Sequence, residues 1–468
     1  DDYEIYQDRD LSPVLWDFIK KNKFFGMIVP EQYGGLGFSA IGHSAVITKL
    51  SSRSVPLGTT IMVPNSLGPA ELLLHYGTEE QKEYYLPRLA TGQDIPCFAL
   101  TEPEAGSDAA SPRSRGVVCK GMFDGKEVLG MRLNWRKRYI TLAPVATVIG
   151  LAFRLFDPDG LLGGEENIGI TCALIPRDID GIMIGDRHDP MGVPFQNGPI
   201  VGKDVFVPLD FIIGGKDGAG QGWRMLMDCL AAGRSISLPS LSVAAAQMVA
   251  RTAGAYATVR EQFGLPIGRF EGIEEPLARI GGYTYLMDAA RKITSGAVDA
   301  GQKPAVLSAI IKAYCTDAMR LVVNDGMDIQ AGAGICRGPR NILGRSFTAV
   351  PIGITVEGAN ILTRSMIIYG QGAIRAHPFV HDEMEAANAG DVPRFDKALF
   401  GHINLVHSNA VRAWFLGFTG SRFTRSPVTG PAAPYYRAFN RFSAAFSLLS
   451  DAAMATMGGS LKRREKIS

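Results

Sequence analysis

Glu357 lies inside an apolar stretch, and its surroundings point more directly to chemistry than those of any other residue in this 468-residue sequence. In the segment 354–362, a glycine and then the start of a helix follow this glutamate. A glutamate is rarely buried without a partner or a task, and burial raises its pKa as a proton-abstracting base requires. The alternative is a carboxylate that caps the following helix.

A polar turn is the second candidate. In the segment 97–108 an apolar strand is predicted to lead into a turn that offers the hydroxyls of Thr101 and Ser107 and a flexible backbone at Gly106. Hydroxyl and N–H groups in such a turn can bind the edge of a flavin or a phosphate. A polar loop that simply follows a strand fits this segment equally well when it is taken alone.

Two further patterns are weaker when each is taken alone. Tyr139 and Thr141 stand two apart on a predicted strand, so the ring and the hydroxyl point the same way. In the segment 260–270 a helix is predicted to end at Phe263-Gly264 before a proline loop, which places Arg260 where it can bind a pyrophosphate. A common strand pattern and an exposed arginine at a helix end are the alternatives.

Other patterns argue against several kinds of site. His377 and His381 are four apart, but no third ligand lies nearby in the sequence, so no metal is predicted. The glycines at 218, 220 and 222 lack the strand and helix of a dinucleotide fingerprint. P-loop and GxSxG motifs are absent, and the 6 cysteines have no CxxC spacing.

Composition and charge narrow the class of protein. Hydrophobic residues make up 46% of the sequence, as in ordinary globular chains, and the net charge of +2 is too weak to predict nucleic-acid binding. The basic segment 462–466 is read as a solvated helix face, with a membrane or partner patch as the alternative. There is neither a signal peptide nor a run of about eighteen apolar residues. Because the sequence starts at Asp1 rather than methionine, we expect a fragment or a processed chain.

Taken together, these segments resemble the acyl-coenzyme A dehydrogenase family from about Tyr6 to Pro378. Their order and the distances between them are more specific than any single segment. The stretches 29–35 (VPEQYGG) and 76–82 (YGTEEQK) are also typical of the family. The tail from His377 resembles the extra helical domain of the bacterial long-chain branch.

The resemblance implies an α+β fold, mainly α, with FAD at the junction of the domains. We expect an N-terminal helical domain at 1–94, a middle antiparallel β domain at 95–215, a C-terminal helical bundle at 216–376 and an additional, incomplete helical tail at 377–468. The residue patterns agree with this order, because helix-like sequence gives way to strand-like sequence near Ile95 and returns near Trp223.

The resemblance also implies a set of cofactor contacts. These are Phe98, Leu100, Thr101, Gly106, Ser107, Tyr139, Ile140, Thr141, Arg260, Gln262, Phe263, Gln330, Gly332, Gly334, Ala359 and Asn360. Arg260 and Gln262 are expected to reach the FAD of a neighbouring subunit. Tyr139 replaces the usual tryptophan, Ala359 a frequent threonine, and either Asp328 or Gln330 the usual glutamine.

Glu357 matches the catalytic base of the family, and Ser107, Arg234 and Gly358 are the implied substrate contacts. Some relatives carry the base just before the arginine of an earlier helix, but here that position is Gly233. The implied reaction is FAD-dependent α,β-dehydrogenation of medium- to long-chain fatty acyl-CoA to trans-2-enoyl-CoA, the first step of β-oxidation. In the family the backbone N–H of the glutamate and a ribityl hydroxyl bind the thioester carbonyl.

Three alternatives to this activity stay open. They are an acyl-CoA oxidase, a related flavoprotein with another substrate, and a catalytically silent acyl-CoA-binding protein. The expected partners are the acyl-CoA substrate and an electron-transfer flavoprotein, and a homodimer is expected, with a tetramer as the alternative. We expect a location in the bacterial cytoplasm, where peripheral association with the inner membrane through segments outside this chain is an alternative.

Overall fold

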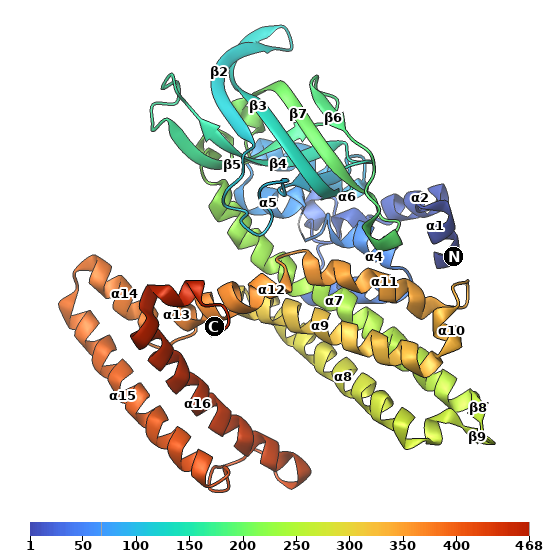
Figure 1. Ribbon diagram of the computed structural model, residues 1–468. Helices are drawn as coiled ribbons and strands as arrows, with labels where there is room; N and C mark the ends of the chain where they lie inside the picture. The colour runs from blue at the N-terminus through green and yellow to red at the C-terminus, as the bar shows by residue number, and fades with distance from the viewer. Residues whose placement is uncertain (67, 468) are drawn as a thin grey trace. The chain divides into compact units, whose positions relative to one another are not determined.

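The computed structural model of this chain describes residues 1–66 and 68–467, which form two compact units. The first unit is Asp1–Asn360 and the second is Ile361–Ser468. Every residue predicted to act in catalysis or in cofactor and substrate binding belongs to the first unit. The α+β class, mainly α, is confirmed: along the chain, the strands of the sheet come between an N-terminal and a C-terminal set of helices, an order that the colours of Figure 1 follow. The proposed four-part division of the sequence stays a prediction.

Helices make up the N-terminal region. They are α1 (Asp2–Asp8), α2 (Pro13–Lys21), α3 (Ala40–Ser51), α4 (Val55–Met62), α5 (Pro69–Tyr76) and α6 (Glu79–Thr91). Ser12 caps α2 by accepting a bond from the N–H of Leu15, as its position before a proline predicts. The sequence 79–87 favours a helix that Pro87 closes. This prediction is wrong, because α6 continues to Thr91 and ends at Gly92 with φ 70°. A single proline removes only one backbone donor, and the rest of the helix compensates for it.

The middle region is a sheet. Its strands are β1 (Pro96–Ala99), β2 (Arg115–Phe123), β3 (Lys126–Thr141), β4 (Val148–Phe156), β5 (Asn167–Pro176), β6 (Ile182–Ile184) and β7 (Asn197–Pro208), in the order β1-β4-β2-β3-β7-β6 with β5 against β4. We predicted antiparallel pairing, and most pairs are antiparallel, but β4 pairs in parallel with β1 and β2. The chain between β1 and β4 includes the whole β2–β3 hairpin, which is long enough for a parallel return.

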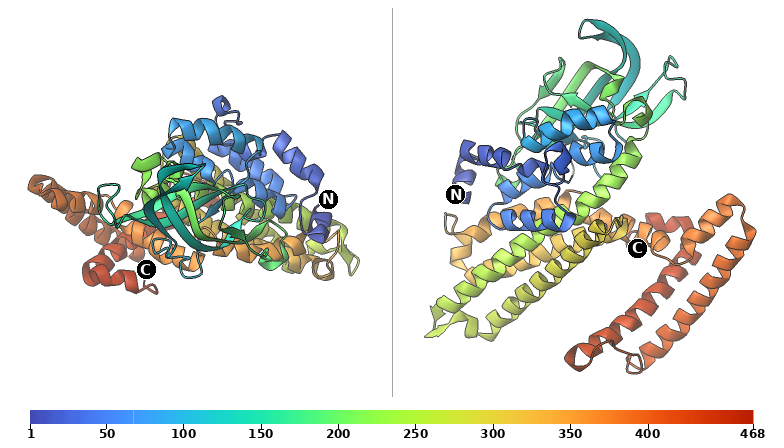
Figure 2. Two further views of the ribbon diagram at one scale, coloured as in Figure 1. Left: turned by 90° about the horizontal axis from the view of Figure 1, so that it is seen from above. Right: turned by 180° about the vertical axis from the view of Figure 1, so that it is seen from behind.

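Long helices form a bundle after the sheet. They are α7 (Gly222–Val259), α8 (Glu271–Asp299), α9 (Ala305–Gln330), α10 (Gly332–Ile335), α11 (Ile342–Thr355) and the short α12 (Asn360–Leu362), which crosses into the second unit. Helix α8 runs antiparallel to both α7 and α9. The C-terminal ends of α7 and α9 therefore lie at the same end of the bundle, away from the sheet (Figures 1 and 2). Helix α7 is long and apolar enough to cross a membrane, but 87% of its most apolar window is buried, as in a core helix.

A small hairpin follows α7, and it corrects one prediction. The helix ends at Val259 rather than at Phe263-Gly264. Instead, β8 (Glu261–Gln262) pairs with β9 (Leu265–Pro266), and the two residues between them have φ of 52° and 76°. Two successive residues with positive φ are typical of the tight turn that matches strand twist, and glycine adopts the second position without strain.

The second unit contains helices joined by turns and has no strand among its described residues. After a π-helical turn at Thr363–Tyr369 it contains α13 (Gly370–Arg375), α14 (Val380–Ala389), α15 (Val392–Phe418) and α16 (Ala433–Met457). Asp451 of α16 is buried and lies 3.2 Å from Nε2 of His377 and 3.4 Å from Nε2 of His402. The sequence did not reveal this group, because its members come from separate helical segments.

The protonation of His377 argues against a metal at this group. Its Nδ1 accepts bonds from the N–H groups of Phe379 (3.2 Å) and Val380 (3.1 Å). The proton of the neutral ring therefore sits on Nε2, which faces Asp451. A metal bound at Nε2 would displace that proton while Nδ1 still faced two donors. Burial also lowers the pKa of His377, which favours the neutral ring.

Candidate active site

Glu357 lies in the loop between α11 and α12, in a conformation that few non-glycine residues adopt. Its φ is 56°, and Gly358 after it has φ 90°. The atom Oε2 is buried and has no hydrogen-bond partner among the described residues. Burial raises the pKa of Glu357 to about 7, against the opposing charges of Lys312 and Arg234. Strained backbone and a desolvated carboxylate are both typical of functional positions.

The loop around Glu357 is bound to helix α9 by side chains. Lys312 of α9 is fully buried and donates to the carbonyls of Ile354 (3.2 Å) and Gly358 (2.7 Å) and to Oδ1 of Asn360 (2.8 Å). The sequence analysis did not single out Lys312. The sequence does contain a sign that Lys312 is buried. This lysine lies four residues from both Ser308 and Thr316, on the same buried stripe of the helix.

Asn360 was predicted to contact a cofactor, but its side chain makes hydrogen bonds inside the protein. Only 3% of it is exposed. Besides accepting from Lys312, it donates through Nδ2 to Ala313 O (3.1 Å), Thr316 Oγ1 (2.8 Å) and Asp317 Oδ1 (3.0 Å). Any cofactor contact at this position would have to come from its backbone.

Helix α7 supplies a second cation near the base. Burial lowers the pKa of Arg234, whose Nε has no hydrogen-bond partner among the described residues, and the charge of Glu357 opposes that shift. The preceding residue, Gly233, is packed so tightly that a Cβ there would lie 2.2 Å from the carbonyl oxygen of Ser66. A glutamate could not occupy position 233 without movement of the backbone. Position 233 therefore cannot supply an alternative catalytic base in this structure.

A buried ion pair fixes the turn that follows β1. Nζ of Lys137 on β3 lies 2.7 Å from Oε1 of Glu102, and both side chains are almost fully buried. Lys137 also donates to the carbonyl of Leu100 (2.9 Å), while Glu102 accepts from the N–H groups of Arg113 (2.7 Å) and Ser114 (3.1 Å). Burial alone would raise the pKa of Glu102, but these partners hold it below its ordinary value.

The ion pair brings two of the predicted segments together. Thr101 lies between the two residues that Lys137 holds, and its carbonyl accepts the N–H of Arg138 (3.0 Å). The polar turn is thus bound to β3 just before Tyr139 and Thr141. Lys137 and Glu102 were not predicted as site residues, although Lys137 continues the period-2 series of buried residues at Met131, Leu133 and Trp135.

Tyr139 interrupts the ladder between β3 and β7. The register shifts between Lys137 and Ile140, and Tyr139 has φ 61° with 56% of its side chain exposed. A bulge of this kind turns a side chain out of the regular pleat. Tyr139 and Thr141 were expected to point the same way on a regular strand. Tyr139 is exposed, Thr141 is half-buried and Ile140 between them is buried, but Tyr139 reaches its position through a bulge.

Six of the predicted cofactor contacts lie at the other end of the bundle. Arg260 and Gln262 are exposed in the β8–β9 hairpin, and Phe263 at its tip is 95% exposed. Gln330, Gly332 and Gly334 follow at the C-terminal end of α9, about 27 Å along that helix from Lys312 at 1.5 Å per residue. A single chain therefore presents these residues far from Glu357.

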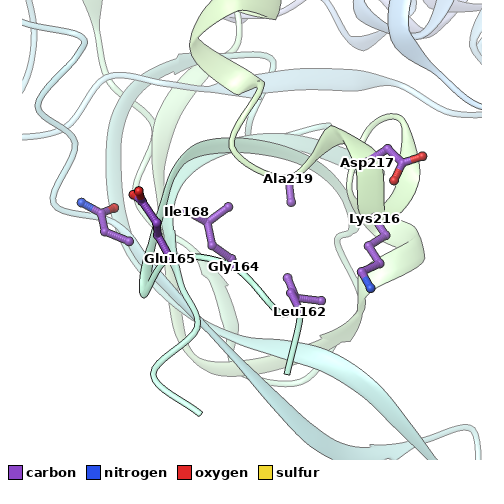
Figure 3. A pocket seen from close by; sticks show the side chains of 8 residues that line it. Leu162, Gly164, Glu165, Ile168, Lys216, Asp217 and Ala219 are labelled. Atoms are coloured by element: carbon purple, nitrogen blue, oxygen red, sulfur yellow. The ribbon is translucent and has the colours of Figure 1, made fainter. Parts of the chain in front are cut away.

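One hollow near β5 is lined by none of these residues. It has a volume of about 330 Å³ and is shown in Figure 3, where Glu165 lies on one side and Lys216 and Asp217 on the other. Its lining consists of Leu162, Gly164, Glu165, Asn167, Ile168, Lys216, Asp217 and Ala219. None of these is a predicted site residue, and we assign no substrate to this hollow.

The residues present fit a flavin. The turn at 101–107 offers exposed backbone and hydroxyls, and a Cβ added at Gly106 would meet nothing within 4 Å. Next to it the bulge presents the exposed ring of Tyr139 and the half-buried Thr141. An aromatic face beside several donors suits a planar heteroaromatic ring whose edge accepts hydrogen bonds.

Comparison with known proteins gives four family models that together span most of the chain. They are described as acyl-CoA dehydrogenase N-terminal domain (residues 2–93), middle domain (97–205), C-terminal domain (220–370) and bacterial-type C-terminal (374–468). The chain is 32% identical over 314 residues to the probable acyl-CoA dehydrogenase YngJ of Bacillus subtilis, covering 66% of this chain and 77% of YngJ.

Other relatives are longer than the region they share. The chain is 29% identical to the probable acyl-CoA dehydrogenase FadE10 of Mycobacterium tuberculosis over 75% of this chain and 53% of FadE10. A shorter match of 104 residues is 61% identical to Protein HemX of Proteus mirabilis, covering 22% of this chain and 61% of that protein. The chain thus spans little more than half the length of these relatives.

Solved structures share the fold. Butyryl-CoA dehydrogenase from Megasphaera elsdenii is similar with a TM-score of 0.68 and 24% identity, covering 79% of this chain and 92% of that one. PigA with FAD and proline is similar with a TM-score of 0.69 and 23% identity, covering 79% and 92%.

The buried ion pair leads to a first prediction. We expect Lys137→Met to lower the free energy of unfolding by about 3–5 kcal/mol, because it leaves the carboxylate of Glu102 buried without its partner. The turn at 101–107 should loosen, so purified protein should retain less FAD. Urea unfolding and flavin absorbance measure the two effects, with the exposed Lys120→Met as the control. Wild-type stability and flavin content in Lys137→Met would contradict this account.

Proposed function

We propose that this chain, which belongs to the acyl-CoA dehydrogenase family, catalyses α,β-dehydrogenation of a fatty acyl-CoA with Glu357 as the base. The observation that carries the proposal is the buried Oε2 of Glu357, which has no hydrogen-bond partner among the described residues, and burial raises the pKa of this carboxyl to about 7. A base with a pKa near the working pH is the most effective proton acceptor. A silent acyl-CoA-binding protein would not need a strained, desolvated carboxylate at this position.

The residues of this chain divide the chemistry between them. Oε of Glu357 takes the proton from the α-carbon of the thioester, and the loop backbone holds the carboxylate in place. Bound FAD supplies the acceptor for the hydride that leaves the β-carbon. Arg234 and Lys312 place positive charge near the carboxylate before the proton arrives, which favours its ionised form. An acyl chain in the site would exclude water and strengthen Glu357 as a base.

The proposed substrate is a medium- to long-chain acyl-CoA, and the proposed acceptor is an electron-transfer flavoprotein. The bacterial-type C-terminal match at residues 374–468 supports this choice, because it extends the earlier resemblance to the bacterial long-chain branch. We propose that the protein works in the cytoplasm of a bacterium, with peripheral membrane association as the alternative. The cysteines are free thiols in the structure, as a reducing compartment requires.

We further propose a homodimer that completes the cofactor site. Arg260, Gln262 and Phe263 are exposed at the end of the bundle opposite Glu357, where they make few contacts with their own chain. In a dimer with a two-fold axis, the hairpin of one protomer can reach the cofactor of the other. The guanidinium of Arg260 suits a pyrophosphate, and the ring of Phe263 would lose its exposure to water.

The proposed base gives a prediction for one variant. Glu357→Gln should retain FAD and bind acyl-CoA, but the anaerobic rate of flavin bleaching should fall by about 1,000-fold, within the range of roughly 10²–10⁴ for a positioned base. In the wild type the rate should rise with pH through about 7 as Glu357 loses its proton. The exposed Glu271→Gln is the control. A Glu357→Gln variant with wild-type bleaching would remove this residue from the mechanism.

The electron acceptor can be tested on the reduced enzyme. After anaerobic reduction by a long-chain acyl-CoA, we expect an electron-transfer flavoprotein to reoxidise the flavin much faster than air-saturated buffer does. An acyl-CoA oxidase would instead react rapidly with oxygen and form stoichiometric hydrogen peroxide. Repeating the reduction with butyryl-, octanoyl- and palmitoyl-CoA gives the chain-length preference, and bleaching by butyryl-CoA alone would contradict the proposed substrate class.

The hairpin leads to a prediction about assembly. We expect Arg260→Ala to lower the affinity for FAD by about 10-fold or more, because a charge-assisted bond to phosphate is worth roughly 1.5–3 kcal/mol. Phe263→Asp should shift the protein from dimer to monomer. Light scattering and flavin titration measure these effects, with Met122→Ala, exposed on β2, as the control. A wild-type protein that is monomeric with bound FAD would contradict the shared site.

A further inference from the structure

A fully buried lysine next to the base has no carboxylate in direct contact. Lys312 has 0% of its surface exposed, and no ion pair joins it within 4.0 Å to any described carboxylate. Its ammonium group carries three protons, and the structure provides three acceptors: Ile354 O at 3.2 Å, Gly358 O at 2.7 Å and Asn360 Oδ1 at 2.8 Å. These acceptors flank Glu357 on both sides: Ile354 is in the last turn of α11, Gly358 is in the loop, and Asn360 begins α12.

We propose that Lys312 is the positioning residue of the base: its ammonium group fixes the loop on both sides of Glu357 and keeps a positive charge beside the carboxylate. This inference rests on the proposed function for its catalytic meaning. It goes beyond that function because it assigns the geometry and the ionisation of the base to a residue that does not itself touch the reacting atoms.

Lys312 binds the backbone on both sides of Glu357. The acceptor carbonyls belong to residues 354 and 358, which bracket Glu357, so one cation draws both ends of the turn toward α9. The residue between them has φ 56°, which an unrestrained glutamate disfavours. Such a conformation persists only where the surroundings hold it, and the bonds from Lys312 are the charged contacts that do so.

Asn360 links the loop of Glu357 to helix α9. Asn360 accepts from Lys312 with one end of its amide and donates with the other to Ala313 O, Thr316 Oγ1 and Asp317 Oδ1. The lysine and the asparagine therefore form one network between the loop and successive turns of a rigid helix. A loop attached in this way cannot move its carboxylate freely when substrate enters.

Lys312 and Glu357 also influence each other through their charges. The charged groups that act on Lys312 are Glu357 and Asp317, which favour its ionised form, and Arg234, which opposes it. Burial lowers the pKa of Lys312 to about 8, and it raises the pKa of Glu357 to about 7 against the charges of Lys312 and then Arg234. Each buried group thus supports the charge of the other across the loop, although they share no direct ion pair.

The experiment compares Lys312→Met, which removes the charge and the donors, with Lys312→Gln, which removes the charge but retains an amide donor. Lys292→Met is the matched control, because Lys292 is an exposed lysine of α8. The full-length FAD-loaded chain is used in each case, and circular dichroism and thermal melting establish that each variant is folded. Two readouts are taken: the pH profile of anaerobic flavin reduction by palmitoyl-CoA, and the titration of Glu357 without substrate.

The second readout uses protein labelled with ¹³C at the glutamate carboxyl carbon, in which Glu357→Gln identifies the signal of Glu357. We expect the midpoint of this titration, and of the pH–rate profile, to move upward by about 1 pH unit in both Lys312 variants. At pH 7 the reduction rate should then fall by about 5-fold, because the ionised fraction drops from about one half to about one tenth. The rate in Lys312→Gln should largely recover at pH 9, while KM for the acyl-CoA stays unchanged.

The outcomes separate this inference from the proposed function. Unchanged midpoints in folded Lys312→Met and Lys312→Gln, or an equal loss of rate at every pH, would overturn the positioning role. If the wild type is not reduced by any acyl-CoA, the proposed function fails, but an upward shift in the carboxyl titration would still support the link between Lys312 and Glu357. Shifted midpoints in the Lys292→Met control would overturn the assignment to Lys312.

Discussion

A buried ammonium group must find hydrogen-bond acceptors inside the protein, and this constraint organises the site. Lys137 and Lys312 are both fully buried, and neither can be left unsatisfied at acceptable cost. Lys137 meets the requirement with Glu102 and the carbonyl of Leu100, which fixes the turn beside the sheet. Lys312 meets it with loop acceptors around Glu357. The flexible segments of the site are thus held by cations on rigid elements.

The same arrangement explains why a proton-abstracting base can persist in the core. Burial makes Glu357 a stronger base by destabilising its charged form, but burial without compensation would leave it protonated. The two cations, Lys312 on α9 and Arg234 on α7, oppose that effect without forming a direct ion pair that would tie up the carboxylate. The carboxylate is therefore ionisable near neutral pH, and its buried Oε2 has no hydrogen-bond partner in the part of the chain that the structure describes. This combination suits a base better than a purely structural group.

Errors in the sequence predictions have local physical causes. Pro87 was expected to end α6, yet the helix tolerates the loss of one donor near its end. The residues Phe263-Gly264 were read as a helix terminus, but the same glycine signal serves the turn of the β8–β9 hairpin. In each case a short motif was compatible with two structures, and packing selected one.

The sequence by itself determined the order of helices, strands and helices, and it singled out Glu357, because a carboxylate in an apolar stretch is visible without coordinates. It also placed the turn at 101–107 and the pair Tyr139 and Thr141, since strand periodicity is local. Only the tertiary structure revealed the partners of these residues. Lys312 is 45 positions before Glu357, and Lys137 is 35 positions after Glu102. Contacts between such distant positions depend on how helices and strands pack, and no local pattern of residues encodes that packing.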